Sequence, residues 1–448
     1  MATVKISDLP QYTSPLVGSE QVAVVQSGVT KRAPLNSITS FLSSGSDSFV
    51  LVSELEALSG NWENTYTEFA AGSATYASTN VSNTFTGLQT IQGELQVTCI
   101  QGGYSNSNAG TYSSVIAGYY NDINGNASFV GGGYNNDLTG GCSIIGGGCN
   151  NCIQCGNFSG ILGGNCNDGC NEYVFIGGGC NNKAAGEFSS IVGGHCNNAL
   201  SAYSVIAGGY NNTVSGIQSF VGGGSCNQAT GDCAVVAGGF SNTASCFRST
   251  IAGGHENCAD DYYTFIGGGY KNCARGDYST VAGGFCNDAQ NDGSSIVSGR
   301  RNVTVGDYSF IGAGADNCAS NIYSTVVAGC ASVASGSHSF VGGGYRNYAT
   351  NDYTTIAGGY NNDATGPNSG VVGGCQNCAV GDASFIGAGK DNIVTHSCST
   401  ALGVEVVSVS GSMLHTNRLW LSAAALETTD PGVSGVVWND SGTLKISI

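Results

Sequence analysis

Branched apolar residues recur through the middle of the chain every 15 residues, each two places before a glycine-rich step. The series runs through 20 units from Ile100 to Ile386, and its one interval of 16 separates Ile145 from Ile161. With this residue as position 0, position +3 is Gly in all 20 units and position −2 is Ser or Thr in 18. Position +6 is Asn in 19 units, with Ser332 as the exception, and position +8 is usually Ala or another small apolar residue. A fixed period of this kind is the signature of a repeat protein.

The pattern inside each unit predicts two short β-strands and two turns. Positions −2, 0 and +2 alternate, as do +6 and +8, and alternation is the period of a strand. Gly at +3 and Gly or Asn near +10 suit turns that need a positive φ. The predicted fold class is therefore all-β, a parallel β-solenoid or β-roll of about 20 fifteen-residue coils. Coils that stack at about 4.8 Å make a rod about 95 Å long.

Stacking of identical positions predicts ladders that run along this rod. The branched residues fill a thin core, and the Asn side chains bond amide to amide from coil to coil. Because these residues recur in nearly every coil, we interpret them as scaffold and not as catalytic groups. So thin a core favours self-association. The ladder residues are Val130, Ile176, Ile206, Ile251, Ile311 and Ile356 in the core, and Asn136, Asn182, Asn212, Asn257, Asn317 and Asn362 beside it.

The repeat over about residues 98–400 reads S-x-V-x-G-G-x-x-N-x-A-x-G-x-Y. It resembles the head repeat of YadA-like trimeric adhesins, S-x-A-x-G-x-x-N/S-x-A-x-G, whose unit is usually 14 residues. That resemblance implies a left-handed parallel β-roll and a homotrimer.

Three further segments resemble parts of phage tail-fibre and virion proteins. Residues 3–43 hold I-S-D-L-P and, further on, E-Q-V-A-V-V-Q-S-G-V-T-K-R, which is similar to the N-terminal segment of such proteins. Residues 83–97, NTFTGLQTIQGELQV, are similar to a fibre-shaft phrase, and residues 430–448 to a C-terminal phrase. The resemblance implies that residues 1–45 form a virion-attachment unit.

The flanks also suggest elements from their own residues. Residues 20–33 predict a hairpin with its turn at Ser27 and Gly28, which could equally be an N-terminal cap of the rod. Ser53 and Glu56 form a capping box, so residues 46–82 are predicted as a short helical neck or linker. Residues 83–97 are predicted as a β lead-in, 98–400 as the shaft, and 401–448 as a small β tip or cap after the period ends at Ile386.

Exposed aromatic residues are the candidate receptor contacts. Trp420 and Trp438 fall in the C-terminal segment, where they could bind a glycan or form the hydrophobic end of the rod. Tyr278 and Tyr308 recur just before the Ser position of their coils. They could offer platforms for a glycan or pack against a neighbouring chain.

Composition and charge narrow the function. The 448 residues include 72 Gly, only 10% are charged, and the formal net charge is −17. Clustered Lys and Arg are needed to bind phosphates or anionic lipid, so nucleic-acid binding and membrane attachment are disfavoured. No apolar run is long enough for a transmembrane helix, and the first residues lack the apolar stretch of a signal peptide. We therefore expect synthesis in a cytoplasm.

Cysteine is abundant, with 20 residues, most of them at outward or turn positions. Cys258 and Cys273 share position +7 in successive coils, which puts them within reach of a disulfide, although a cytoplasmic origin favours free thiols. The run Cys149, Cys152, Cys155 has a spacing close to metal sites, but the first two recur as a pair elsewhere in the repeat, so no metal site is predicted.

These features together predict a non-enzymatic trimeric virion fibre, namely a phage tail fibre that attaches by its N-terminus and mediates host-surface recognition and adsorption. The alternatives are a capsid or neck decoration fibre, a tailspike polysaccharide depolymerase, and a cell-surface adhesin. The predicted partners are two further copies, phage tail or other virion proteins at the N-terminus, and a host glycan or protein receptor. No catalytic residue, cofactor, nucleic acid or membrane insertion is predicted, and the expected location is the virion surface.

Overall fold

The structure is a computed structural model that describes residues 21–26, 29–34, 99–408, 414–416, 437–440 and 443–446. The chain divides into two units, Met1–Leu95 and Gln96–Ile448. In the first unit, β1 (Gln21–Gln26) pairs antiparallel with β2 (Val29–Pro34), and the pairing closes at Gln26 and Val29. The structure thus has the expected hairpin. The predicted neck at 46–82 and lead-in at 83–97 lie outside the described residues.

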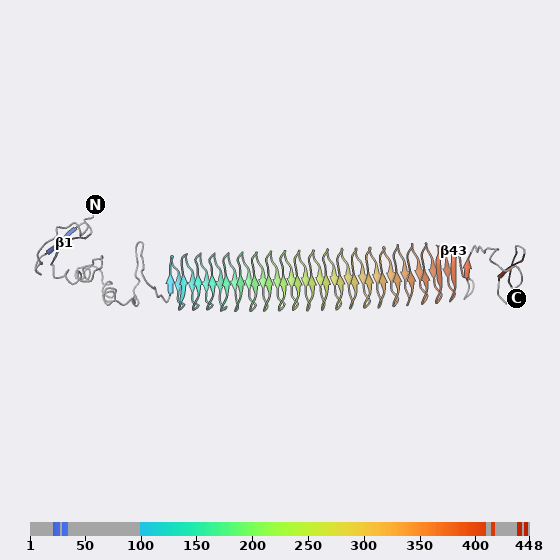
Figure 1. Ribbon diagram of the computed structural model, residues 1–448, viewed down its shortest axis with the longest axis horizontal. Coiled ribbons are helices and arrows are strands. Elements are labelled where there is room, and N and C mark those ends of the chain that lie inside the picture. The colour runs from blue at the N-terminus through green and yellow to red at the C-terminus, as the bar shows by residue number, and fades with distance from the viewer. Residues whose placement is uncertain are drawn as a thin grey trace. The chain divides into compact units, whose positions relative to one another are not determined.

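In the second unit the chain winds into stacked coils that carry two parallel sheets (Figure 1). Sheet 1 contains position 0, sheet 2 contains position +8, and each strand pairs with its counterparts in the coils before and after. The strands of sheet 1 are β3 (Cys99–Gln101), β5 (Ser113–Val115), β7 (Phe129–Val130), β9 (Ile144–Ile145), β11 (Gly160–Ile161), β13 (Phe175–Ile176), β15 (Ser190–Ile191), β17 (Val205–Ile206), β19 (Phe220–Val221), β21 (Val235–Val236), β23 (Thr250–Ile251), β25 (Phe265–Ile266), β27 (Thr280–Val281), β29 (Ser295–Ile296), β31 (Phe310–Ile311), β33 (Thr325–Val326), β35 (Phe340–Val341), β37 (Thr355–Ile356), β39 (Gly370–Val371), β41 (Phe385–Lys390), β43 (Thr400–Val404) and β44 (Leu414–Thr416).

The strands of sheet 2 alternate with these along the chain. They are β4 (Ser107–Asn108), β6 (Asp122–Ile123), β8 (Asp137–Leu138), β10 (Cys152–Ile153), β12 (Asp168–Gly169), β14 (Lys183–Ala184), β16 (Asn198–Ala199), β18 (Thr213–Val214), β20 (Gln228–Ala229), β22 (Thr243–Ala244), β24 (Cys258–Ala259), β26 (Cys273–Ala274), β28 (Asp288–Ala289), β30 (Val303–Thr304), β32 (Cys318–Ala319), β34 (Val333–Ala334), β36 (Tyr348–Ala349), β38 (Asp363–Ala364), β40 (Cys378–Ala379) and β42 (Ile393–Val394). Near the C-terminus, β45 (Val437–Asp440) pairs antiparallel with β46 (Thr443–Ile446).

The core lies between the two sheets and is one side chain thick on each side. Ile251 of sheet 1 and Ala259 of sheet 2 are both fully buried, and Ile251 pairs in register with Ile266 one coil further on. The predicted core residues Val130, Ile176, Ile206, Ile251, Ile311 and Ile356 all lie in this core. The predicted all-β fold, a parallel solenoid of about 20 coils, is confirmed, and the described residues contain no helix.

The turns differ from the prediction. Gly at +10, as at Gly276, does not take a positive φ. In the 20 units the positive φ values outside the glycines at +2 and +3 lie at positions −3 and +5, as at Tyr278 (φ 59°) and Lys271 (φ 51°). Tyr278 donates its backbone N–H backward to the carbonyl of Tyr262 in the previous coil at 2.9 Å, whereas strand residues donate forward. A left-handed non-Gly residue costs about 1–2 kcal/mol. The backward hydrogen bond helps to offset this cost.

The solenoid also ends later than the sequence predicted. Ile386 pairs in register with Ala401, which is fully buried at position 0 of a further coil, and Thr400 pairs with Leu414 of β44. The prediction that the period stops at Ile386 is wrong. The period was traced by branched residues, and Ala401 is not branched although it fills the same core position. At the other end, Gln101 pairs with Val115, so the first coil enters one residue out of register.

Candidate functional site

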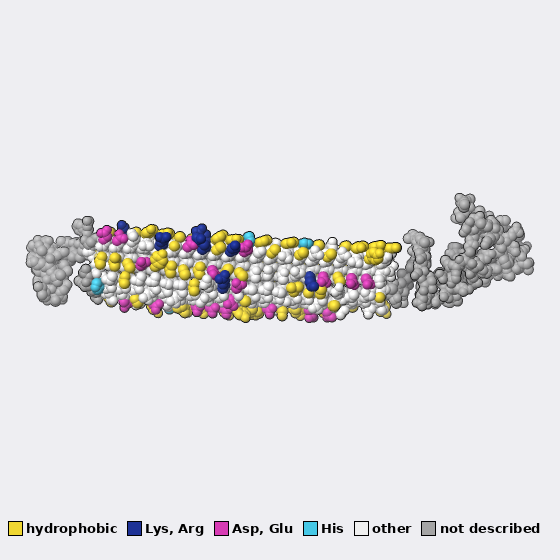
Figure 2. All heavy atoms as spheres, turned by 180° about the vertical axis from the view of Figure 1, so that it is seen from behind, with side chains coloured by type: hydrophobic (Ala, Val, Ile, Leu, Met, Phe, Trp, Pro, Cys, Tyr) yellow, Lys and Arg dark blue, Asp and Glu magenta, His cyan; other side chains and the backbone are white. Residues whose placement is uncertain are grey.

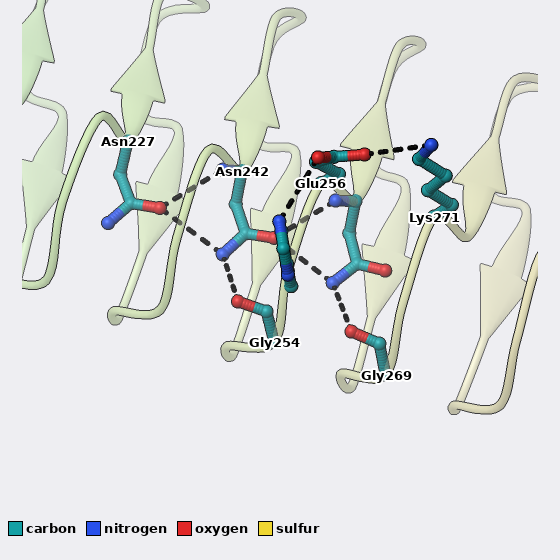
Figure 3. A network of polar contacts seen from close by, with 8 residues as sticks. Asn227, Asn242, Gly254, Glu256, Gly269 and Lys271 are labelled. Atoms are coloured by element: carbon teal, nitrogen blue, oxygen red, sulfur yellow. Dashed lines mark hydrogen bonds and ion pairs between the residues drawn. The ribbon is translucent and has the colours of Figure 1, made fainter.

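The Asn at position +6 forms a closed hydrogen-bond ladder inside the shaft (Figure 3). The side-chain N–H₂ of Asn242 donates to the carbonyls of Gly238 (3.0 Å) and Gly254 (2.9 Å), and its Oδ1 accepts the backbone N–H of Asn257 (3.0 Å). Its own backbone N–H donates to Oδ1 of Asn227 at 3.0 Å. The polar atoms of the amide are therefore used by its own coil and by the coils on either side. The predicted Asn136, Asn182, Asn212, Asn257, Asn317 and Asn362 all lie buried in this ladder.

Gly at position +3 is the partner that this ladder requires. Gly254 has φ +93°, and a Cβ there would lie 2.3 Å from the carbonyl oxygen of Gly269 and 2.6 Å from Nδ2 of Asn257. The left-handed backbone and the close approach of the Asn amide both exclude a side chain. The Asn at +6 therefore requires the Gly at +3, because its amide occupies the space that a side chain at +3 would fill.

The Ser or Thr at position −2 supports the opposite bend. In the first coils Ser128 donates from Oγ to the carbonyl of Gly140 at 2.8 Å and accepts the backbone N–H of Ser143 at 3.3 Å. Further along, Ser249 bonds the carbonyl of Cys246 in its own coil at 2.7 Å instead. In other coils, as at Ser189 and Ser204, the buried hydroxyl has no hydrogen-bond partner, so only part of this row stabilises the backbone.

Aromatic residues at position −3 form stacks on the outside of the second bend. Phe158, Tyr173, Phe188 and Tyr203 follow one another in successive coils with ring centroids 4.6–5.1 Å apart and nearly parallel planes. Each ring covers a face of the next, so the inner rings of a stack present only their edges to solvent. A ring at the end of a stack keeps one face free.

The two predicted tyrosine contacts are such end rings. Tyr278 stacks on Tyr263 at 4.9 Å and is 63% exposed, while Tyr308 stacks on Tyr323 at 5.4 Å and is 56% exposed. The coil between them has Gly293 at position −3, which carries no side chain. Gly293 therefore interrupts the row of rings, and the ring of Tyr308 lies over this glycine, with its Cδ1 2.6 Å from where a Cβ of Gly293 would be. The repeat pattern alone did not single out Gly293. Trp420 lies outside the described residues, and Trp438 is in β45, paired with Lys445.

Cys258 and Cys273 pair directly across sheet 2, and both are free thiols. Burial, with the neighbouring Asp260 as a second cause, raises the pKa of Cys258 to about 12, and burial also raises the pKa of Cys273. A thiol held protonated is a poor nucleophile and a poor metal ligand. The disulfide between them stays a prediction.

The remaining ionisable and metal-binding side chains do not gather at one site in the described part of the chain. There, no three His, Cys, Asp or Glu residues come together as a group that could hold a metal ion. The charged side chains form exposed pairs between coils, such as Lys271 with Glu256 at 3.1 Å (Figure 3), which contribute little to stability. Within the same residues no helix is long and apolar enough to cross a membrane.

Comparison with known proteins adds no identity: no family model matches the chain, and no curated protein matches it significantly.

Proposed function

We propose that the chain is a non-enzymatic virion fibre, a phage tail fibre that attaches by its N-terminus and carries host-surface recognition. The observation that supports this most is the shaft itself, which has about 20 near-identical coils. The amide groups of its Asn ladder form hydrogen bonds to adjacent coils and are not free to bind a substrate. Such a structure gives length, rigidity and a repeated outer surface. Its N-terminal hairpin belongs to the segment whose sequence resembles the attachment end of virion fibres.

We infer that the working form is a homotrimer on the virion surface. A net charge of −17 per chain, multiplied by three, keeps neighbouring fibres apart in solution. The N-terminal unit binds tail or other virion proteins.

The receptor class that best fits the outer surface is a saccharide. Sugars stack on free aromatic faces, and the end rings Tyr278 and Tyr308 offer such faces on both sides of Gly293. The ring of Tyr308 lies over Gly293, so a sugar that stacks between the two tyrosines displaces this ring by a side-chain rotation. The C-terminal segment supplies a second possible contact through Trp420 and Trp438.

A competition experiment tests the proposal. Purified full-length chain, added in excess to host cells, is expected to bind them and to slow adsorption of the particles. A boiled sample is the control. Binding to cells with no effect on adsorption would contradict the role in host recognition, and release of reducing sugar from host polysaccharide would favour a depolymerase.

A further inference from the structure

The two bends of the coil differ in charge. Position −4, on the second bend, is Asp or Glu in eight of the 20 units and is never Lys or Arg. Positions +4 and +5, on the first bend between sheet 1 and sheet 2, carry three acidic residues and five of the eight Lys and Arg residues found between residues 99 and 408. In Figure 2 most Lys and Arg side chains lie along the upper edge of the shaft, and a row of Asp and Glu lies along the lower edge. The five cationic residues of the first bend are Lys271, Arg300, Arg301, Arg346 and Lys390.

The two lysines of the first bend each have a carboxylate of their own. Lys271 pairs with Glu256 at 3.1 Å, and Lys390 pairs with Asp391 at 3.2 Å. Around each lysine the charges therefore balance, and the excess of positive charge lies at the arginines.

The three arginines have a single carboxylate among them. Asp316 accepts from Nε of Arg301 at 2.7 Å and lies 3.7 Å from a terminal nitrogen of Arg300. Arg346 forms no ion pair with any residue that the structure describes, and its guanidinium lies 5.1 Å from the ring centre of Tyr345. The side chains of Arg300 and Arg301 are 56% and 55% exposed. Three positive charges against one negative leave an excess of two positive charges on an accessible surface.

Aromatic rings border these arginines on both sides. Phe285 lies one coil before Arg300 at the same coil position and ends a stack with Tyr270, with ring centroids 5.2 Å apart. Tyr345 stacks on Tyr360 at 5.5 Å, on the other side. Phe285 is 45% exposed and Tyr345 is 36% exposed. A ring beside a guanidinium is a combination that can hold a sugar ring and its carboxylate together. We call the following residues the arginine patch: Phe285, Arg300, Arg301, Tyr345 and Arg346.

The spacing of the arginines suits an extended ligand. Arg300 and Arg346 are separated by three coil steps, about 14 Å along the shaft. At position +4 the two residues between them are Ala315 and Cys330, whose side chains are much shorter than those of the arginines. A chain of sugar residues can lie across these two positions and reach both ends of the patch, and contacts at both ends of one ligand reinforce each other.

We propose that the arginine patch binds a saccharide that bears carboxylates, with the carboxylates on the three arginines and a sugar ring on Phe285 or Tyr345. A planar guanidinium matches a carboxylate through two parallel hydrogen bonds. The ion pair between Arg301 and Asp316 does not prevent this contact, because exposed ion pairs contribute little and a ligand carboxylate can replace Asp316.

This surface is distinct from the tyrosines of the second bend. Tyr278 follows Asp277 and Tyr308 follows Asp307, and these carboxylates repel an anionic sugar. The two bends therefore select saccharides of different charge, an uncharged one at the tyrosines and an acidic one at the arginine patch. A second receptor class of this kind rests on the proposed role of the shaft in host recognition.

Binding is tested by titration calorimetry of the full chain with oligomers of galacturonate and of sialic acid. The methyl ester of the galacturonate oligomer is the matched ligand without charge. We expect at least one acidic oligomer to bind, and the ester to bind roughly tenfold more weakly or worse than the galacturonate oligomer, because its hydrogen bonds to the guanidinium groups lose their charge. High salt should weaken binding, because exposed charges are screened.

A pair of matched variants tests the residues. The double variant Arg301→Gln, Arg346→Gln removes two guanidinium groups from the arginine patch. The control Lys183→Gln, Arg248→Gln removes two charges elsewhere, one on sheet 2 and one on the second bend. We expect the first to lose roughly tenfold or more in affinity for the acidic oligomer and the second to keep its affinity.

The thiol of Cys330 reports where the ligand lies, because this residue stands between the arginines. Alkylation of Cys330, followed by mass spectrometry of its peptide, should slow when the acidic oligomer is bound. Cys375 occupies the same coil position three coils further on and should react at an unchanged rate.

Equal binding of the methyl ester, an unchanged affinity of the patch variant, or failure of both acidic oligomers to bind would overturn the proposal. Equal binding of single-stranded DNA of the same charge would also overturn it, because the patch would then select charge and not a sugar. The competition with particles judges host recognition separately. A chain that slows adsorption but binds neither acidic oligomer would overturn the arginine patch and leave host recognition intact, whereas a chain that binds the oligomer without slowing adsorption would support the patch and contradict host recognition.

Discussion

The side-chain amide of Asn242 lies directly against Gly239 of its own coil, where a Cβ would be only 2.5 Å from Asn242 Nδ2. From this position the amide donates to the carbonyl of Gly254 in the next coil at 2.9 Å. The Asn at +6 and the Gly at +3 therefore act as one unit that locks each coil to the next. Figure 3 shows the same contact repeated at Gly269.

Replacing Asn242 should destabilise the shaft. The change Asn242→Ala leaves the carbonyl of Gly238 and the backbone N–H of Asn257 without their partner. An unsatisfied buried polar group costs about 1–3 kcal/mol, so we expect a loss of at least about 2 kcal/mol in chemical denaturation. The exposed Gln228→Ala on sheet 2 is the control and should change stability by less than about 0.5 kcal/mol. Equal effects of the two changes would contradict the ladder.

Replacing Ser332, the one residue at position +6 that is not Asn, should complete the ladder. Ser332 accepts the backbone N–H of Asn347 with its hydroxyl at 3.3 Å but has no amide to reach the carbonyls of its neighbours. The change Ser332→Asn restores those hydrogen bonds, and we expect it to stabilise the shaft by about 1 kcal/mol. Hydrogen exchange of the amides in coils 317–347 should slow. Faster exchange there would show that the coil has adapted to Ser.

Two adjacent glycines should respond differently to the same change. Gly254→Ala forces a side chain into a left-handed backbone and against the carbonyl oxygen of Gly269, so we expect a loss of about 2 kcal/mol or more. Gly253→Ala meets open space, and Ala occurs naturally at its position in Ala313, so it should be near neutral. Thermal unfolding of the two variants measures the difference. Similar midpoints would mean that the turn geometry is wrong.

Thiol reactivity should follow burial. The raised pKa of Cys258, about 12, leaves almost no thiolate at pH 8, so alkylation should be slow there and fast at the exposed Cys142. Because the folded pKa lies above the ordinary value of 9.0, this group stabilises the fold below pH 9 and the contribution is lost as the pH rises from about 9 to 12. The variant Cys258→Ser should show a smaller loss of stability over that range. Rapid alkylation of Cys258 in the folded chain would contradict its placement.

A tyrosine in place of Gly293 should close the interruption between the two aromatic stacks, because Tyr occurs at the same coil position in the coils on either side. Gly293 has φ +64°, the same backbone in which Tyr278 and Tyr308 lie, and only the flexible ring of Tyr308 stands where its Cβ would be. Gly293→Tyr should complete the stack, keep or raise stability, and remove binding of uncharged saccharides measured by glycan array. Gln218→Tyr, at position −3 of another coil, is the control. Unchanged binding by the Gly293 variant would place the receptor contact elsewhere.

The coil could be predicted from the sequence because the same type of residue recurs at each coil position every 15 residues, from Val130 to Ile386. This spacing alone determines which residues stack on one another. The left-handed turns could not be predicted from the sequence, because Tyr at −3 has no intrinsic preference for a positive φ. The backward hydrogen bond to the previous coil stabilises this backbone conformation. The recurrence of Asn at +5, as in Asn135 and Asn211, was the available signal.

The proposal that this chain is a virion fibre is tested most directly by electron microscopy of particles labelled with gold-conjugated antibody raised against the shaft, residues 99–408. We expect gold on thin projections at the tail. Gold on the capsid would keep the fold but exclude adsorption as the function, and gold on cells but on no particle would contradict a virion fibre.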